Sequence, residues 1–257
     1  MQRYKILSWN VNGIRAIFKK GIDDFLEKFD PDILCLQETK ALEHQIDVLP
    51  KELIKYYSTY NSAEKKGYSG TATYSKIKPL NINLGLEDDK FNTEGRVIQS
   101  IYKEFTLFNI YFPNGQKDEN RLAFKLDFYN HLIELMQKKI LNNEKLIIVG
   151  DFNTAHEEID LARPKENQNR SGFLKQEREV LDNLLKLGFI DSFRLFNKDG
   201  ENYTWWDPIT KARDRNVGWR IDYVFISKNL KKNLKSAFIL NEVYGSDHCP
   251  IDITLEF

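Results

Sequence analysis

The sequence predicts an α/β (α+β) fold in which two mostly antiparallel sheets pack together with helices on the outside. Short β-rich runs recur in both halves of the chain, and each half also carries one or two amphipathic helices. No Gly/Ser-rich or Pro-rich linker and no low-complexity segment divides the 257 residues. Because an apolar sheet face must be covered, two packed sheets with outer helices are the economical solution. We therefore expect residues 1–257 to form one domain.

The first half begins with a strand at KILSWNV, and IRAIFKKGIDDFLEKF follows with helical periodicity. Pro31 breaks the chain before a second strand, DILCLQE. Between Tyr57 and Phe112 the chain holds several short β-rich runs: STYNSA, GTATYSK, NINLGL, RVIQSIY and TLFNIYF. Their spacing predicts a meander, in which consecutive strands pair with one another.

The second half begins with the clearest amphipathic helix, RLAFKLDFYNHLIELMQKKI, after acidic capping-type residues at 118–120. LIIVGDFN is predicted to be a buried strand, and a polar stretch from His156 to Gly172 follows it. LKQEREVLDNLLKLG is the next strong helix. The runs YTWWD, WRIDYVFIS, SAFIL and IDITLEF complete a second β-rich half.

Composition limits the class of protein. The chain is 41% hydrophobic, which suffices for a sizeable core, and it has neither an apolar run long enough for a bilayer nor a signal peptide. We expect an intracellular protein, not a secreted or membrane protein. Two cysteines form no disulfide framework or zinc site. Basic and acidic residues number 38 each, but neutrality does not exclude nucleic acid, because a divalent-cation site adds acids to the total.

Polar residues stand where four predicted strands end. SWNVN places Asn10 and Asn12 on one face, LCLQE ends in Glu38, and IIVGDFN ends in Asp151 and Asn153. A single such residue is usually a turn former.

Asp222 is different, because it interrupts an apolar strand and a buried carboxylate needs a partner. His248 is a candidate partner that would gain a fixed tautomer. Together with Asp247, these residues form an oxygen-rich set without cysteine, as Mg²⁺ or Mn²⁺ prefers. Hydrolysis of a phosphoester by an activated water suits such a site, and no P-loop, GxGxxG fingerprint or Ser triad competes.

Seven motifs stand in order over almost the whole chain: LSWNVNGIRA, LCLQETK, YFPN, GDFNTAHEEIDL, FLKQERE, NVGWRIDY and GSDHCPI. They resemble the exonuclease III family of abasic-site endonucleases, within the endonuclease/exonuclease/phosphatase superfamily. The resemblance implies a four-layer α/β/β/α sandwich and a monomer that cuts double-stranded DNA 5′ to an abasic site with Mg²⁺, for which Mn²⁺ substitutes. It also implies 3′-exonuclease, 3′-phosphatase and 3′-diesterase activity on blocked 3′ ends.

The resemblance implies a role for each matching residue. Glu38 is the principal metal ligand, with Asn10 and Asp247 near the metal. His248, oriented by Asp222, contacts the phosphate; Asp151 activates or positions the water; Asn153 orients the phosphate; and Tyr111 donates to a phosphate oxygen or the leaving group. Asn114 lies near the phosphate and Trp219 walls the sugar pocket. The resemblance leaves open whether Asp151 or His248 is the general base and whether the site holds one metal ion or two.

The adjacent residues Trp205 and Trp206 point to opposite faces if they lie in a strand. We therefore expect one of the two indoles in the core and the other at the sugar pocket.

The expected contacts to the DNA backbone are Asn12, Arg15, Lys40, Lys65, Lys66, Tyr68, Arg213 and Arg215. Three departures bear on the activity. Asn12 stands where some members carry Asp, Arg170 stands where some abasic-site specialists carry Asn, and the loop after Asn114 lacks an early arginine. Two alternatives therefore stay open within the superfamily: a predominantly 3′-5′ exonuclease, or a phosphatase acting on a non-DNA phosphate. A non-catalytic DNA-binding protein is a third, which the complete set of reactive residue types disfavours.

Overall fold

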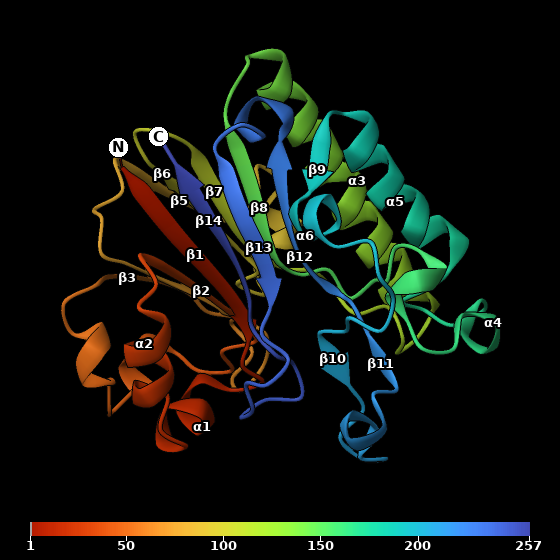
Figure 1. The fold of residues 1–257 in the computed structure, drawn as a ribbon, viewed down its shortest axis with the longest axis horizontal. Helices are drawn as coiled ribbons and strands as arrows, with labels where there is room; N and C mark the ends of the chain where they lie inside the picture. The colour runs from red at the N-terminus through yellow and green to blue at the C-terminus, as the bar shows by residue number, and fades with distance from the viewer. Residues whose placement is uncertain (1) are drawn as a thin grey trace.

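The computed structural model describes residues 2–257, which form two six-stranded sheets packed face to face (Figure 1). The first sheet contains, in spatial order, β13 (Leu234–Ile239), β14 (Ile251–Glu256), β1 (Arg3–Asn10), β2 (Ile33–Gln37), β4 (Thr71–Ser75) and β3 (Tyr57–Asn61). The second contains β5 (Asn81–Leu84), β6 (Val97–Ile101), β7 (Thr106–Tyr111), β8 (Leu146–Asp151), β12 (Asp222–Ser227) and β9 (Phe189–Asp191).

Both sheets share one pairing pattern. A single parallel pair, β1–β2 in the first sheet and β7–β8 in the second, is flanked on each side by antiparallel pairs. The predicted architecture of two mostly antiparallel sheets is therefore confirmed. Parallel strands end at the same edge of a sheet, so the carboxyl ends of β1, β2, β7 and β8 can contribute to one site.

The core between the sheets comes from alternate residues of the strands. Ile6 and Ile253 of the first sheet pack with Ile147, Val149 and Ile226 of the second, and all five are buried. Burying each such aliphatic side chain contributes about 1.5–3 kcal/mol. Because successive side chains of a strand point to opposite faces of the sheet, the alternate residues of these strands face the outer helices.

Helices cover the two outer faces and complete the four layers. The first sheet is covered by α1 (Ile14–Lys19) and α2 (Asp23–Phe29), and the second by α3 (Glu119–Leu141) and α5 (Lys175–Lys186). Asp118 caps α3, as the sequence predicts, by accepting a 2.8 Å hydrogen bond from the Arg121 N–H. The implied α/β/β/α sandwich is thus confirmed.

Two local expectations are wrong. The strands between Tyr57 and Phe112 do not form one meander, because β3 and β4 belong to the first sheet and β5, β6 and β7 to the second. The continuous helix expected over 14–29 is two helices, α1 and α2, separated at Gly21, whose φ of 86° lies in the left-handed region. Glycine adopts that conformation without a Cβ penalty and ends the first helix.

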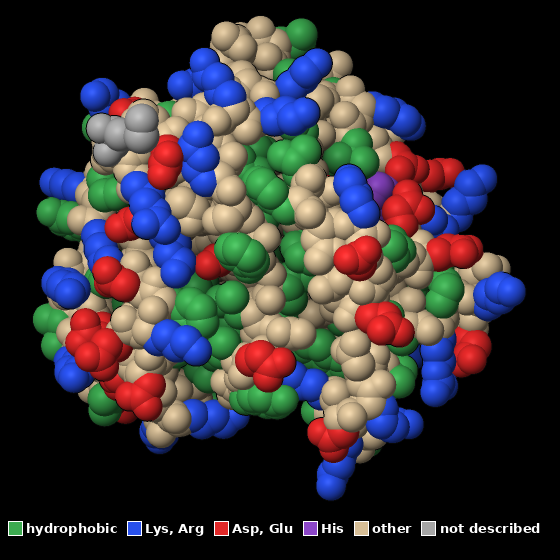
Figure 2. All heavy atoms as spheres, in the orientation of Figure 1, with side chains coloured by type: hydrophobic (Ala, Val, Ile, Leu, Met, Phe, Trp, Pro, Cys, Tyr) green, Lys and Arg blue, Asp and Glu red, His purple; other side chains and the backbone are tan. Residues whose placement is uncertain are grey.

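Short elements complete the chain. They are α4 (Pro164–Asn167), α6 (Ser192–Phe196) and the two-residue strands β10 (Trp205–Trp206) and β11 (Gly218–Trp219), which pair and project beyond the sandwich (Figure 1). Within residues 2–257, no helix combines the length and the apolar character that crossing a bilayer requires. Figure 2 shows Lys and Arg side chains interspersed with Asp and Glu on the face drawn, consistent with the balanced charge.

Candidate active site

The strand register brings the predicted polar residues to one edge of the sandwich. In the second sheet, Asp151 at the end of β8 pairs with Tyr111 at the end of β7 and with Asp222 at the start of β12. In the first sheet, Asn10 ends β1 beside Gln37, which precedes Glu38. Because the two sheets face each other, these strand ends meet across the interface.

The turns after these strands hold side chains in fixed directions. Asn12, Glu38, Lys40 and Asn153 all adopt left-handed backbone conformations, with φ between 46° and 56°. Each such residue costs on the order of 1 kcal/mol or more, and non-glycine residues in this region concentrate at functional sites. All four line the same cavity.

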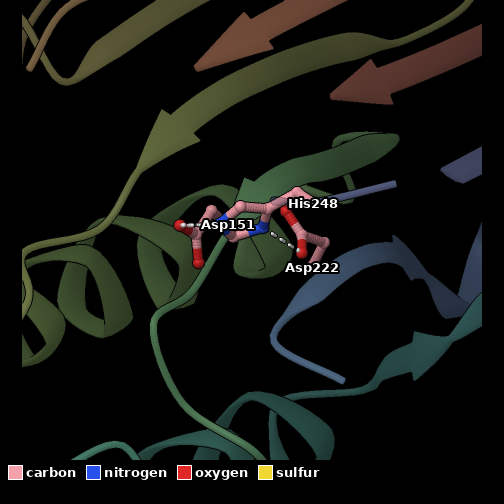
Figure 3. Close-up of side chains that lie close together, drawn as sticks. All are labelled: Asp151, Asp222 and His248. Carbon is pink, nitrogen blue, oxygen red and sulfur yellow. Dashed lines mark hydrogen bonds and ion pairs between the residues drawn. The ribbon is translucent and has the colours of Figure 1, made fainter. Parts of the chain in front are cut away.

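Asp222 and His248 form the central pair of the site (Figure 3). The Oδ2 atom of Asp222 lies 2.8 Å from Nδ1 of His248, and both side chains are buried. The other ring nitrogen, Nε2, lies 3.8 Å from Oδ2 of Asp151. The partnership predicted from the buried carboxylate is therefore present in the structure, and it leaves Nε2 for Asp151 and the cavity.

The charges of this group shift the pKa of each member. Burial lowers the pKa of His248, but the carboxylates of Asp222 and Asp151 outweigh it, so the net pKa is raised above its usual value. Burial raises the pKa of Asp151; the positive charge of His248 opposes this and the carboxylate of Asp222 adds to it. At neutral pH His248 is thus an imidazolium beside the carboxylate of Asp222, and its Nε2–H is a donor toward Asp151 and the cavity.

Asn10 links the two sheets at the floor of the site. Its buried amide donates 3.0 Å to Oε2 of Glu38 and 2.8 Å to Oδ2 of Asp151. The ammonium of Lys40 lies 2.9 Å from Oε1 of Glu38 and also contacts Asn12. Glu38 therefore presents a carboxylate that already attracts a cation, beside a second carboxylate held by the same amide.

Asp247 reaches the cavity from the opposite side. Its carboxylate accepts hydrogen bonds from the Asn12 amide (3.0 Å) and from the indole of Trp205 (3.1 Å). Burial raises the pKa of Asp247, but His248, Trp205 and Asn12 lower it by a larger amount. The net pKa lies below its usual value, so the carboxyl stays ionised. Asn12, where some family members carry Asp, thus bridges Asp247 and Lys40 with an uncharged group.

The described part of the chain also contains a tighter set of possible metal ligands, Asp151, Asp222 and His248, whose donor atoms lie within 4.8 Å of one another. Asp222 and His248, however, turn one atom each toward the other, which leaves only the second carboxylate oxygen of Asp222, buried and without a hydrogen-bond partner in the structure, and the far ring nitrogen. The oxygen atoms of Glu38 and Asp247 suit a hard divalent cation better, because Mg²⁺ and Mn²⁺ prefer carboxylates to imidazole. The residues present therefore fit a Mg²⁺-type ion.

A cavity of about 290 Å³ opens over these groups. One side is polar and the other is formed by Trp205, Trp219 and Ile221. The predicted residues that line it are Asn12, Glu38, Lys40, Tyr111, Asn114, Asp151, Asn153, Trp219, Asp247 and His248. Asn10 and Asp222 lie behind this lining and position it through hydrogen bonds. The expectation that one of the adjacent tryptophans is core holds for Trp206, which is buried, while Trp205 faces the cavity.

Tyr111 and Tyr68 are held by an arginine network. The Arg96 guanidinium stacks 4.7 Å from the Tyr111 ring centre, and Arg96 and Arg121 donate to the Tyr68 hydroxyl at 3.3 and 3.1 Å. Glu94 accepts from both arginines. Burial raises the pKa of Tyr111 well above its usual value, with a contribution from Glu38, so Tyr111 remains a neutral hydroxyl donor.

The remaining predicted DNA contacts lie outside the cavity. Arg15, Lys65 and Lys66 are exposed. Arg213 is engaged within the protein: its guanidinium stacks on Trp206 and Tyr244 and donates to the carbonyls of Asn241 and Val243. Arg215 is exposed and donates to the carbonyl of Thr210.

Sequence reasoning missed part of the site. It did not place Gln116, Gly172 or Ile221 in the cavity, nor the supporting Arg96 and Arg121. Arg170, noted only as a departure, lies exposed on the cavity rim. Lys125 and Glu177 support the cavity from below and were also missed, although a charged residue on the apolar face of each helix was a usable signal.

Comparison with known proteins identifies the class of site. The family model described as "Endonuclease/Exonuclease/phosphatase family" matches residues 7–248, nearly the whole chain. The chain belongs to the endonuclease/exonuclease/phosphatase family.

Relatives within the endonuclease/exonuclease/phosphatase family carry nuclease names. The chain is 42% identical to an exodeoxyribonuclease of Bacillus subtilis (strain 168), covering 98% of this chain and 99% of the relative. It is 43% identical to the DNA repair nuclease APEX1 of Danio rerio, covering 98% and 82%. The 3′ phosphatase NExo from Neisseria, solved with a product DNA hairpin, superposes with a TM-score of 0.90 at 27% identity, covering 99% and 100%.

These family relatives confirm two predictions made from the motifs. The fold is that of the endonuclease/exonuclease/phosphatase family, and the class of enzyme is the DNA-repair nuclease class of phosphodiester hydrolases.

Proposed function

We propose that the chain hydrolyses the phosphodiester 5′ to an abasic site in double-stranded DNA as a monomer, leaving a 3′-hydroxyl, and that it also removes blocking groups and nucleotides from 3′ ends. The observation that carries this proposal is the His248–Asp222 pair beside Asp151, at the base of a cavity walled by Trp205 and Trp219. Relatives named as exodeoxyribonucleases and abasic-site endonucleases support the choice of DNA.

In this proposal water attacks phosphorus, the bond from phosphorus to the 3′ oxygen breaks, and the phosphate stays on the 5′ carbon of the abasic sugar. Asp151 takes the proton from water: its pKa is raised, which improves it as a base, and it faces the cavity. The raised pKa of His248 argues against His248 as the base and favours it as a donor to a phosphate oxygen.

Three further residues complete the proposed set. Asn153 orients the phosphate, Asn114 donates to the side-chain oxygen of Asn153 at 3.1 Å, and the neutral hydroxyl of Tyr111 donates to the phosphate or the departing oxygen. Glu38 and Asp247 would hold Mg²⁺ or Mn²⁺, which when bound supplies positive charge to the phosphate oxygens. Asn10, whose side-chain oxygen accepts from the Asn12 N–H, would position Glu38 from behind the cavity lining.

The cavity supports selection for a missing base. An abasic nucleotide has no base to unstack, so turning it out of the duplex costs less than flipping a paired nucleotide. A small cavity with two indole rings accepts a bare sugar and excludes one that carries a base. Backbone contacts at Asn12, Arg15, Lys40, Lys65, Lys66 and Tyr68 would hold the flanking strand, whereas Arg213 serves this purpose only if it leaves its stacked position.

A second function of the same site, release of a terminal 3′ phosphate, is favoured by one observation. Arg170 places a cation on the cavity rim, where it can pair with a terminal phosphate, and the similar NExo structure is named a 3′ phosphatase. The change Arg170→Asn tests this function, because it removes the cation from the rim. It should reduce 3′-phosphate release more than abasic incision, and equal rates of both reactions before and after the change would contradict a role for Arg170.

The deciding experiment uses an end-labelled duplex with one tetrahydrofuran abasic analogue, which cannot undergo β-elimination. A Mg²⁺-dependent cut at the analogue that leaves a 3′ end extendable by a polymerase, abolished by EDTA, supports the endonuclease. A ladder from the 3′ end supports a predominant exonuclease. DNA that stays intact with Mg²⁺ as well as with EDTA contradicts the proposal and favours a phosphatase that acts on a non-DNA phosphate.

A further inference from the structure

A buried ion pair lies beneath the cavity, between the two helices that cover the second sheet. Lys125 of α3 and Glu177 of α5 are both fully buried, and Nζ lies 2.6 Å from Oε1. Each occupies the apolar face of its helix, where Phe128 follows Lys125 and Val180 follows Glu177 by three positions. Charges are rarely buried completely, and a pair in the core is not in itself stabilising compared with apolar residues of the same size.

The lysine holds one wall of the cavity. Its Nζ donates 2.7 Å to the backbone carbonyl of Asn153. The backbone of Asn153 is left-handed (φ 51°). The side-chain amide of Asn153 donates to the Phe112 carbonyl at 2.9 Å and to Asp151 at 3.3 Å. Lys125 therefore anchors the peptide that sets Asn153 beside Asp151.

The glutamate holds the adjoining segment of the cavity lining. Its Oε1 accepts from the Ser171 hydroxyl (2.9 Å), and its Oε2 accepts from the Gly172 N–H (2.6 Å) and the Leu174 N–H (3.1 Å). Gly172 packs against Trp219 so closely that an added Cβ would come within 3.3 Å of the indole ring. Glu177 thus fixes the segment against which Trp219 rests.

We infer that Lys125 and Glu177 are positioning residues: one buried ion pair sets the placement of two adjoining segments of the cavity lining, the turn at Asn153 and the segment at Gly172 that packs on Trp219. The polar contacts of both charged groups go to each other or to segments that line the cavity. This inference rests on the proposed function for its kinetic test only, because the placement of the walls is also measurable without a reaction.

The test replaces both charges together, as Lys125→Met with Glu177→Leu. Because no unpaired buried charge remains, such a replacement commonly preserves the fold, while the Gly172 and Leu174 N–H groups lose their acceptor. We expect a cooperatively folded variant whose kcat on the tetrahydrofuran duplex falls by about 10²-fold, the loss typical of small misplacements in an active site. KM should change less than about twofold, since exposed cations set most DNA affinity.

A matched control is available on the same helix. Lys139 near the end of α3 pairs with Glu144 at 3.2 Å, away from the cavity lining. Lys139→Met with Glu144→Leu makes the same chemical change and should leave kcat unchanged. Wild-type kcat in the folded Lys125/Glu177 variant, or an equal loss in the control, would overturn the inference.

Amide hydrogen exchange separates this inference from the proposed nuclease function. The Gly172 and Leu174 N–H groups donate to Glu177, so both should exchange faster in the double variant than in the wild type, with no substrate present. Faster exchange with a wild-type protein inert on DNA would support the positioning role and remove the nuclease proposal. Unchanged exchange of both amides would remove the positioning role even if the wild-type protein cuts DNA.

Discussion

Oδ2 of Asp222 accepts a hydrogen bond from Nδ1 of His248 across 2.8 Å, and this one contact ties the start of β12 to the segment before β14. The carboxylate fixes the orientation of the imidazolium ring and turns Nε2 toward Asp151 and the cavity. Two elements that belong to different sheets thereby present a single reactive group.

Asp222→Asn should lower kcat by about 10²–10³-fold, the loss typical of one misplaced donor to a reacting oxygen. The same change removes one of the carboxylates that raise the pKa of His248, so that pKa should fall. The imidazolium would then be lost at a lower pH, and the alkaline limb of the kcat–pH profile should move to lower pH. The pH profile and the His248 ring resonances in NMR check both parts; an unmoved limb contradicts the assignment.

His248→Gln should move the acid limb of the profile in the opposite direction. The positive charge of His248 opposes the burial that raises the pKa of Asp151. Without that charge the pKa of Asp151 rises further, so Asp151 becomes a carboxylate only at higher pH and the acid limb should shift upward. The residual kcat of His248→Gln, measured across pH, tests the predicted shift of the acid limb. His131→Gln in α3 is the control.

Glu38→Gln should weaken Mn²⁺ binding by at least about tenfold, because a neutral amide replaces the carboxylate of a hard-cation site. Isothermal titration without DNA measures this directly, and the Mg²⁺ concentration for half-maximal incision should rise in parallel. The exposed Glu64 offers a matched control, Glu64→Gln. Equal Mn²⁺ affinity in the two variants would show that Glu38 is not a ligand.

Trp219→Ala should affect abasic incision more than 3′-phosphate release. The indole forms part of the cavity wall and packs edge to face with Phe173 at 6.5 Å. Loss of the wall removes the surface that holds an extruded sugar, whereas a 3′ end needs no extrusion. The ratio of the two kcat/KM values is the measurement, and equal losses on both substrates would place Trp219 in general support of the fold.

Asp160→Asn should destabilise the protein at neutral pH by about 3–5 kcal/mol, the cost of removing one partner of a buried pair, and leaves Asp191 as the remaining carboxylate partner of Arg220. Asp160 accepts from Arg220 at 2.8 and 3.0 Å and from Arg194 at 2.5 Å. Burial raises its pKa, but the two arginines lower it more, so the pKa lies below its usual value.

The stabilisation by Asp160 is therefore full above the unfolded-state pKa and is lost as the pH falls toward the lower folded-state value. Urea unfolding should show a difference between wild type and Asp160→Asn that is largest near neutral pH and shrinks in acid. Asp127→Asn, which removes an exposed ion pair with Lys90, should cost less than about 1 kcal/mol. A difference for Asp160→Asn that does not change with pH would contradict this account.

Much of the fold could be predicted from local patterns in the sequence. The helix at α3 was predicted with its Asp118 cap, and each strand run has a counterpart, because amphipathic period and capping chemistry are local properties. The pairing of Asp222 with His248 was also predictable, since a buried carboxylate needs a partner and the chain has four histidines. The sheet membership of β3 to β7 was not predictable in this way, because a strand has the same alternation in either sheet.

The sequence by itself determined the family, the layered architecture and the inventory of reactive groups, since each depends on residue types and on short-range order. Tertiary structure alone decided that Asn10 bridges Glu38 and Asp151, that Arg213 is engaged within the protein, and that Lys125 and Glu177 support adjoining segments of the cavity lining. These contacts join residues far apart in the chain. Only the packing of the two sheets and their helices determines which distant charges meet in the same buried space.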